Sequence, residues 1–203
     1  MTHGKRAFDA LAAGVGLLLL SPLLVLIAAV VKLADGGPIF FRQQRVGRGG
    51  QPFLMWKFRT MVPGAERLGH QITVGNDPRV TPVGRVLRAL KLDELPQLIN
   101  VLAGDMSLVG PRPEVSRYTA LYSPQERPVL DLVPGITDPA SIRYRDEGAL
   151  LAAAADPERI YVDEIMPDKI RLNLEYAARA TVWSDFLVVV RTVARVAAPG
   201  TTR

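Results

Sequence analysis

The sequence predicts a mixed α/β protein, mostly helical with a short β-hairpin, that begins with a membrane helix. Three observations support this: the uncharged run 10–31, the alternation of basic and apolar residues in segment 39–59, and helix-start signals after residue 80. We expect residues 1–35 to form a proline-broken, re-entrant membrane helix. Residues 36–203 should form a small cytoplasmic domain that carries interfacial amphipathic helices.

Composition limits the kinds of site that the chain can build. At 203 residues it is long enough for one compact domain of roughly 150 residues plus an appended hydrophobic element. It has no cysteine and two histidines, which excludes disulfides, Cys-based zinc sites and multi-His metal sites. A net charge of +5 suits nucleic acid, anionic lipid or a phosphorylated substrate. We do not expect nucleic acid as a partner, because aromatic and basic residues interleave in one hairpin alone.

Ser21 and Pro22 interrupt the apolar N-terminal run near its middle. Its 22 residues would reach about 33 Å as a helix, enough for a hydrocarbon core of about 30 Å. Pro22 removes a backbone donor, so we predict a kink, with the Ser21 hydroxyl available to a freed carbonyl. Basic residues flank both ends, from Lys5 before the run and Lys32 after it, as expected of two cytoplasmic ends. From the residues alone, three alternatives stay open: a re-entrant hairpin, a single span and a buried core helix. A signal peptide is not expected, because no cleavage site follows the apolar run.

The segment 39–59 reads as two short strands joined by a turn at Gly49-Gly50. Lys57 and Arg59 are two residues apart and would lie on one face of the second strand. We therefore predict that they share an anionic target.

Helix signals follow in the middle of the chain. Thr81-Pro82 predicts a helix start, and Arg88 lies on a face of that helix. Asp93 is predicted to cap a second helix, because Pro96 is tolerated only in a first turn. A carboxylate there would lie at the positive end of the helix dipole, beside backbone donors that phosphate oxygens can use.

The last predicted helix, 182–197, gathers Phe186, Val190 and Val193 on one face. Together with Trp183, this face suits the interfacial depth of a membrane. Packing of the same face against the domain core is the equal alternative.

Four motifs, 41–47, 57–61, 92–102 and 104–113, closely resemble the bacterial sugar transferases, the small monotopic phosphoglycosyl transferases. The resemblance covers nearly the whole chain. It includes the membrane helix, which in that family is re-entrant and carries a Ser-Pro pair. The resemblance therefore favours the re-entrant form here.

The resemblance implies transfer of a phospho-sugar from a UDP-sugar to a polyprenol phosphate, typically undecaprenyl phosphate, with release of UMP. This would take place at the cytoplasmic face of the bacterial inner membrane and begin the assembly of a surface glycan. Residues 36–203 would be the catalytic domain. By resemblance Asp93 is the nucleophile, and Glu94 beside it helps to hold Mg²⁺. Such chemistry needs a metal and fixed cations, because anionic phosphate oxygens repel a carboxylate.

Further site residues match the family by position: Lys57, Arg88, Arg112 and, least directly, Asp168. Arg112, between two prolines, has an alternative structural role as an ion-pair partner of Asp105 or Glu114. Segment 134–142 departs from the family pattern, so neither the sugar nor the glycan pathway is predicted. There Asp138 and Ser141 could face sugar hydroxyls, although a turn role suits Asp138-Pro139 better.

Two wider questions stay open from the sequence. The oligomeric state is not predicted, and a homodimer is compatible with the chain. The alternative of another class is a non-catalytic, membrane-associated scaffold that keeps the basic surface without needing Asp93.

Overall fold

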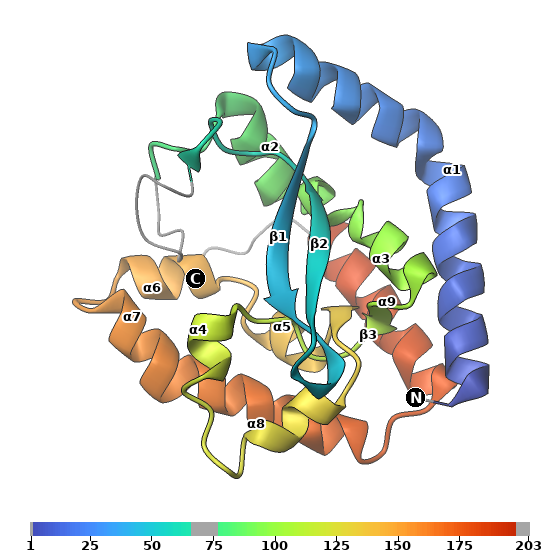
Figure 1. The fold of residues 1–203 in the computed structure, drawn as a ribbon, viewed down its shortest axis with the longest axis vertical. Coiled ribbons are helices and arrows are strands. Elements are labelled where there is room, and N and C mark those ends of the chain that lie inside the picture. Colours follow the sequence, from blue (N-terminus) through green and yellow to red (C-terminus); the bar gives the residue numbers. More distant parts are fainter. Residues whose placement is uncertain (1, 66–76, 198–203) are drawn as a thin grey trace.

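The computed structural model describes residues 2–65 and 77–197, and shows helices arranged around two small sheets (Figure 1). The end of the second predicted region, 198–203, lies outside the described residues. The coarse prediction of a mostly helical fold with small sheets and a long apolar N-terminal helix is confirmed. The helices are α1 His3–Asp35, α2 Pro82–Ala89, α3 Gln97–Ala103, α4 Ser116–Thr119, α5 Pro139–Arg143, α6 Glu147–Ala152, α7 Pro157–Ile160, α8 Met166–Ala177 and α9 Val182–Ala197. The strands are β1 Phe40–Val46, β2 Pro52–Phe58, β3 Ser107–Val109 and β4 Gly135–Thr137.

Helix α1 is 33 residues long, and among the described residues it alone is long and apolar enough to cross a membrane. It continues through Pro22 and bends along its length in Figure 1. Pro22 cannot donate to the carbonyl of Leu18, four residues earlier, and the Ser21 hydroxyl donates to that oxygen at 2.8 Å. The predicted use of Ser21 is therefore confirmed. The apolar helix indicates membrane association.

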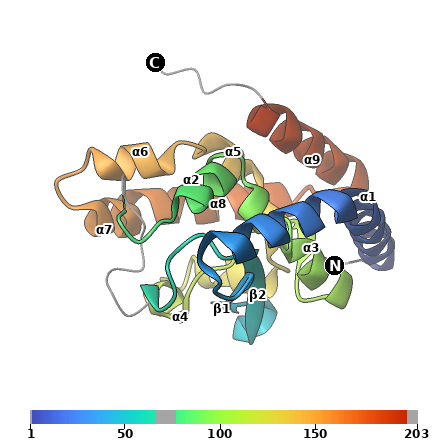
Figure 2. The ribbon, with the colours of Figure 1, turned by 90° about the horizontal axis from the view of Figure 1, so that it is seen from above.

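Both ends of α1 are fixed to the rest of the molecule. At its start, the Lys5 ammonium pairs with Asp185 of α9, and Arg6 donates to the carbonyl of Leu102 at 2.8 Å. At its end, Asp35 accepts hydrogen bonds from the Arg59 guanidinium. Figure 2 shows α9 beside the first part of α1. The helix thus lies along one side of the molecule and is held at both termini.

The predicted hairpin is confirmed. β1 and β2 pair antiparallel with Phe40 opposite Phe58 and Val46 opposite Pro52. The side chain of Asn100 in α3 accepts from the Trp56 N–H at 2.9 Å and also donates to a β2 carbonyl. This amide fixes α3 against β2, and with it the turn that precedes α3.

The second sheet is a short parallel pair, β3 with β4. Just beyond β3 the backbones come so close that a Cβ on Gly135 would lie 2.1 Å from the Gly110 nitrogen. Glycine is required there because any side chain would overlap the neighbouring backbone. The Gly135 N–H donates to Pro111 at 2.9 Å, which fixes the backbone before Arg112.

Helix α2 begins at the predicted Thr81 cap, whose oxygen accepts from the Gly84 N–H at 2.9 Å. The predicted cap at Asp93 is wrong. Helix α3 begins at Gln97 after Pro96, and Asp93 lies in a separate 3₁₀ turn, η3 Leu92–Glu94. Proline lacks the N–H that would join the two into one helix, so the chain before it tightens into i→i+3 bonds such as Leu95 N–H to Leu92 C=O at 3.3 Å.

Helix α9 has the predicted bounds, and it packs inward through Asp185 and Val188. Its apolar face lies open instead of packing against the core: Trp183 is 67% exposed and Val193 is 63% exposed. The core-packing alternative for this face is therefore wrong. Its placement at a membrane interface stays a prediction.

Candidate functional site

Glu94 is the centre of a partly buried ion-pair cluster. Its Oε1 accepts from the Lys57 ammonium at 3.0 Å, and both of its oxygens accept from the two Nη atoms of Arg112 in a bidentate pair. Burial raises the pKa of the Glu94 carboxyl, but the charges of Arg112 and Lys57 outweigh it and hold the pKa well below its usual range. Glu94 is therefore a permanent anion that brings two distant segments together.

Asp93 has a different environment from its neighbour. It is 6% exposed, and its Oδ1 is buried without a hydrogen-bond partner among the described residues. Burial and the adjacent Glu94 charge raise the pKa of Asp93, against the lowering effect of Lys57 and Arg88. A buried carboxylate oxygen that lacks a partner is a high-energy acceptor, available to a ligand, a proton or a cation.

Arg88 reaches the same region from the last turn of α2. Its Nε donates to the Thr60 hydroxyl at 2.8 Å, and Thr60 is itself locked against α2. A Cβ on Gly84 would lie 2.0 Å from the Thr60 carbonyl oxygen, so the close contact needs glycine. The sequence motif indicated Arg88, but nothing in the pattern identified Thr60 as its support.

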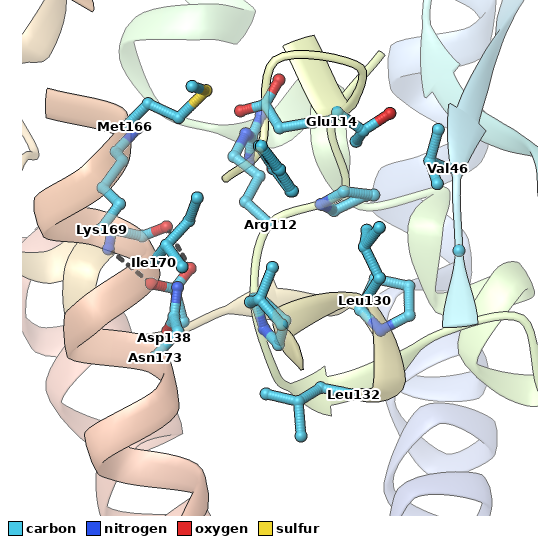
Figure 3. A pocket seen from close by; sticks show the side chains of 18 of the residues that line it. Val46, Arg112, Glu114, Leu130, Leu132, Asp138, Met166, Lys169, Ile170 and Asn173 are labelled. Carbon is cyan, nitrogen blue, oxygen red and sulfur yellow. Dashed lines mark hydrogen bonds between the residues drawn. The ribbon is translucent and has the colours of Figure 1, made fainter. Parts of the chain in front are cut away.

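Arg112 projects from the loop after β3 beside a small cavity of about 40 Å³ (Figure 3). In Figure 3, Glu114 reaches into this cavity from the same loop as Arg112, and Lys169 and Asn173 reach it from α8. The Arg45 guanidinium donates to the Pro113 carbonyl at 3.0 Å, and Tyr161 donates to Glu114. These contacts brace the Arg112 loop. Sequence reasoning missed Arg45 as part of this support, although its alternation with Gln43 along β1 places both on one face.

A groove of about 1270 Å³ runs past this cluster. Arg88, Lys91, Glu94 and Arg112 line its polar part, and segments of α1 and α9 supply apolar walls. The apolar lining residues from these two helices are Ala12, Gly16, Leu20, Val189 and Val193. An anionic head and a hydrocarbon tail could both be accommodated in one continuous groove.

The structure does not bring every predicted residue to this groove. Lys57 and Arg59 do not share a target: Lys57 binds Glu94, whereas Arg59 is 7% exposed and binds Asp35 and the Pro38 carbonyl. The strand ends at Phe58, so Arg59 no longer follows its alternation. The prediction of a shared anion is wrong, and Arg59 anchors the end of α1.

Asp168 lies in the first turn of α8. It accepts from the Tyr144 hydroxyl at 2.7 Å and pairs with Arg171. These two hydrogen bonds, Tyr144 first, lower the pKa of Asp168. Tyr144 lines the groove, so Asp168 contacts the groove wall through this tyrosine.

The alternatives for two other residues are also decided by geometry. Arg112 pairs with Glu94 instead of Asp105 or Glu114, so the alternative partners are wrong. Asp138 caps α5, where it accepts from the Ser141 N–H at 2.9 Å and from its hydroxyl at 2.6 Å. The predicted turn role of Asp138 is confirmed.

Residues 93 and 94 offer a donor set that fits Mg²⁺. Within the described ranges no group of three or more His, Cys, Asp or Glu residues could hold a metal ion. Mg²⁺ is, however, commonly held by one or two carboxylates together with substrate phosphates and water. The Oδ1 of Asp93 is free, whereas both Glu94 oxygens already accept from Arg112 and Oε1 also accepts from Lys57, so a metal would use the remaining lone pair of Glu94 Oε2 or displace one of these cations.

The fold and the site together define a membrane-associated protein whose cationic groove suits phosphorylated ligands. Residues 1–199 match the family model described as Bacterial sugar transferase, and the chain belongs to this family.

Three relatives show how members of this family are described. The chain is 39% identical over 193 residues to a UDP-N-acetylgalactosamine-undecaprenyl-phosphate N-acetylgalactosaminephosphotransferase of Aeromonas hydrophila. It is 40% identical over 192 residues to a UDP-glucose:undecaprenyl-phosphate glucose-1-phosphate transferase of Caulobacter vibrioides. It is 42% identical over 198 residues to a protein of Escherichia coli with the same description. Each match covers 93% of this chain, but it spans 42%, 68% and 39% of the respective relatives.

Proposed function

We propose that this protein is a UDP-sugar:undecaprenyl-phosphate sugar-1-phosphate transferase that begins polysaccharide synthesis. The family, and relatives named for this reaction with two different sugars, support the reaction class. The observation that carries the proposal is the Asp93-Glu94 turn with three cations around it, Lys57, Arg88 and Arg112. This turn lies beside a groove to which α1 and α9 contribute apolar walls.

The proposed reaction has two displacements. An Asp93 oxygen attacks the sugar-bearing phosphorus of the UDP-sugar, and the bond to the bridging oxygen breaks, so that UMP leaves with the electron pair. An oxygen of the lipid phosphate then attacks the same phosphorus, and the Asp93 carboxylate leaves. Attack requires the Asp93 side chain to turn from its buried position toward the groove, because Glu94 and not Asp93 lines the wall.

Fixed charges would assist both displacements. Lys57 and Arg112 hold Glu94 in place, and Arg88 offers its remaining N–H groups to equatorial phosphate oxygens. Mg²⁺ bound by Asp93 and Glu94 would supply Lewis-acid neutralisation of the phosphate charge. Arg45 donates to the Pro113 carbonyl and so holds the Arg112 loop in the position where Arg112 meets Glu94.

The test is adduct formation without the lipid acceptor. Given a panel of UDP-sugars and Mg²⁺ alone, the protein should gain the mass of one phospho-sugar and release a matching amount of UMP. Asp93→Asn should form no adduct, whereas the matched exposed variant Asp131→Asn should form it normally. UMP release only after lipid is added would favour direct attack by the lipid phosphate. No turnover across the panel with lipid present would favour the scaffold alternative.

We also propose that α1 is re-entrant, with both ends at the cytoplasmic face of the bacterial inner membrane, and that residues 36–203 form the catalytic domain. The support is that Lys5 and Asp35, at opposite ends of α1, both bind this second part of the chain. A spanning helix would place these two contacts on opposite sides of the bilayer, although both partners, Asp185 and Arg59, lie within residues 36–203.

Single cysteines placed near Lys5 and Lys32 test this topology. Both should be shielded from an impermeant thiol reagent in intact cells. Labelling of the N-terminal site alone would show a span. Pro22→Ala should shift the population toward that labelled state, because the helix would straighten.

A further inference from the structure

Lys91 has an unusual backbone conformation for a lysine. Its φ is +55°, and among the described residues it is the one non-glycine with positive φ. Hydrogen bonds on both sides hold it there, from its own N–H to Arg88 at 3.1 Å and from the Glu94 N–H to its carbonyl at 3.4 Å. Glycine or asparagine adopts this conformation at lower energy. Strain of this kind commonly occurs at functional positions.

Among the described residues that line the groove, Lys91 and Arg195 of α9 are the two cations whose side chains make no hydrogen bond or ion pair, and Lys91 is the one next to the Asp93-Glu94 turn. It is exposed, it lines the groove beside Arg88, and its ammonium has no hydrogen bond or ion pair within residues 2–65 and 77–197. By contrast, Lys57 and Arg112 are both bound to Glu94. A ligand phosphate entering the groove therefore meets Lys91 without having to break an existing pair.

The position of Lys91 relative to α1 indicates which phosphate it would meet. The next residue, Leu92, packs with Leu87 against the second half of α1, in a cluster that contains Ile27 and Val31. The preceding Leu90 lines the groove and is 49% exposed. Lys91 is thus a cation between two apolar residues beside α1, the position that would suit the phosphate of a lipid whose chain follows this helix.

We propose that Lys91 binds the phosphate of the lipid acceptor and sets the affinity of this protein for it. This proposal rests on the proposed function. The prenyl chain would follow the apolar walls that α1 and α9 contribute to the same groove, while its phosphate stays at the polar end. The ammonium would act as a point charge for a phosphate monoester, through charge-assisted hydrogen bonds.

Lys91→Gly is the informative variant, because glycine suits the positive φ while it removes the charge. At sub-saturating polyprenyl phosphate, transfer from a preformed adduct should slow by about tenfold, the loss expected for one charge-assisted hydrogen bond. The loss should be clearly larger in this transfer than in adduct formation. Lys91→Arg should recover most of the transfer rate, because it restores the charge. Arg85→Gln, which removes an exposed cation of α2 outside the groove lining, controls for bulk charge and should lose far less.

Equilibrium binding provides a readout besides activity. A fluorescent polyprenyl phosphate should bind Lys91→Gly about tenfold more weakly than the parent protein, whereas the corresponding polyprenol without phosphate should show no such difference. Equal losses in adduct formation and transfer would assign Lys91 to the nucleotide donor and overturn the proposal. Unchanged binding of the lipid phosphate would overturn it too. Absence of any adduct in the parent protein would instead refute the proposed function, so the two failures are distinguishable.

Discussion

Replacing Arg112 with lysine separates the geometry of this residue from its charge. The guanidinium donates to both oxygens of Glu94, and the lysine ammonium would keep the charge but lose one of these two bonds. A hydrogen bond to a charged group contributes about 1.5–3 kcal/mol. A third of the Arg112 side chain is exposed, so we take the lower end, about 1.5 kcal/mol.

Because the variant also loses a fixed donor of the proposed site, the rate of UMP release in the presence of lipid acceptor should fall by roughly tenfold. A fall in melting temperature of about 3–6 °C should accompany it, because the same bonds join the Arg112 loop to the η3 turn. Arg117→Lys is the matched control. Arg117 also pairs with a glutamate, Glu158, but both side chains are exposed, and such surface pairs contribute little. Near-normal rates in Arg112→Lys, or equal losses in the two variants, would refute the reasoning.

Three other perturbations have defined outcomes. Gly84→Ala should destabilise the protein by about 1–3 kcal/mol in denaturant titration, because its Cβ would overlap the Thr60 backbone, whereas Gly148→Ala in open space should be neutral or stabilising. Because the pKa of Asp93 is raised in the folded state, the native protein binds the extra proton and loses stability as pH rises from 3.8 through the raised pKa. The melting temperature of Asp93→Asn should therefore rise relative to that of the parent protein as the pH increases from about 4 through the raised pKa, and a difference independent of pH would contradict this shift. Chelation by EDTA should abolish UMP release, and Mg²⁺ should restore it; full activity in EDTA would remove the metal from the proposal.

Capping residues, turn residues and apolar periodicity predicted several secondary-structure elements correctly. The Thr81-Pro82 start of α2, the hairpin around Gly49-Gly50 and the bounds of α9 are as predicted, because capping, turn and periodicity rules act over a few residues. The prediction that Asp93 caps a helix was wrong, because Pro96 has two opposing effects on the chain. Pro96 can begin a helix, but it also separates that helix from the turn before it.

The candidate site was predicted through motifs and not through geometry. Motif matching identified Glu94 and Arg112, yet their bidentate pair joins residues 18 positions apart and could not be seen in the sequence. The predicted anionic target of Arg59 was wrong because Arg59 lies one residue beyond the end of β2 and no longer follows the alternation of the strand. Its guanidinium instead binds Asp35, 24 positions away. Thr60 and Arg45 support Arg88 and the Arg112 loop through contacts 28 and 68 positions away, which neither the motifs nor the strand alternation that contain these residues could predict.

The contact between Lys5 and Asp185 has a consequence for biogenesis. These residues are 180 positions apart, so the ion pair cannot form until the segment that separates them has been synthesised. At about 5–20 residues per second, the start of α1 waits roughly 10–40 s for its partner in α9. This contact therefore forms later than the contacts of α1 that join Asp35 to Arg59 and Arg6 to the Leu102 carbonyl. During that interval the end of α1 can already be anchored by Arg59, whereas its start has to wait first for Leu102 and then for Asp185.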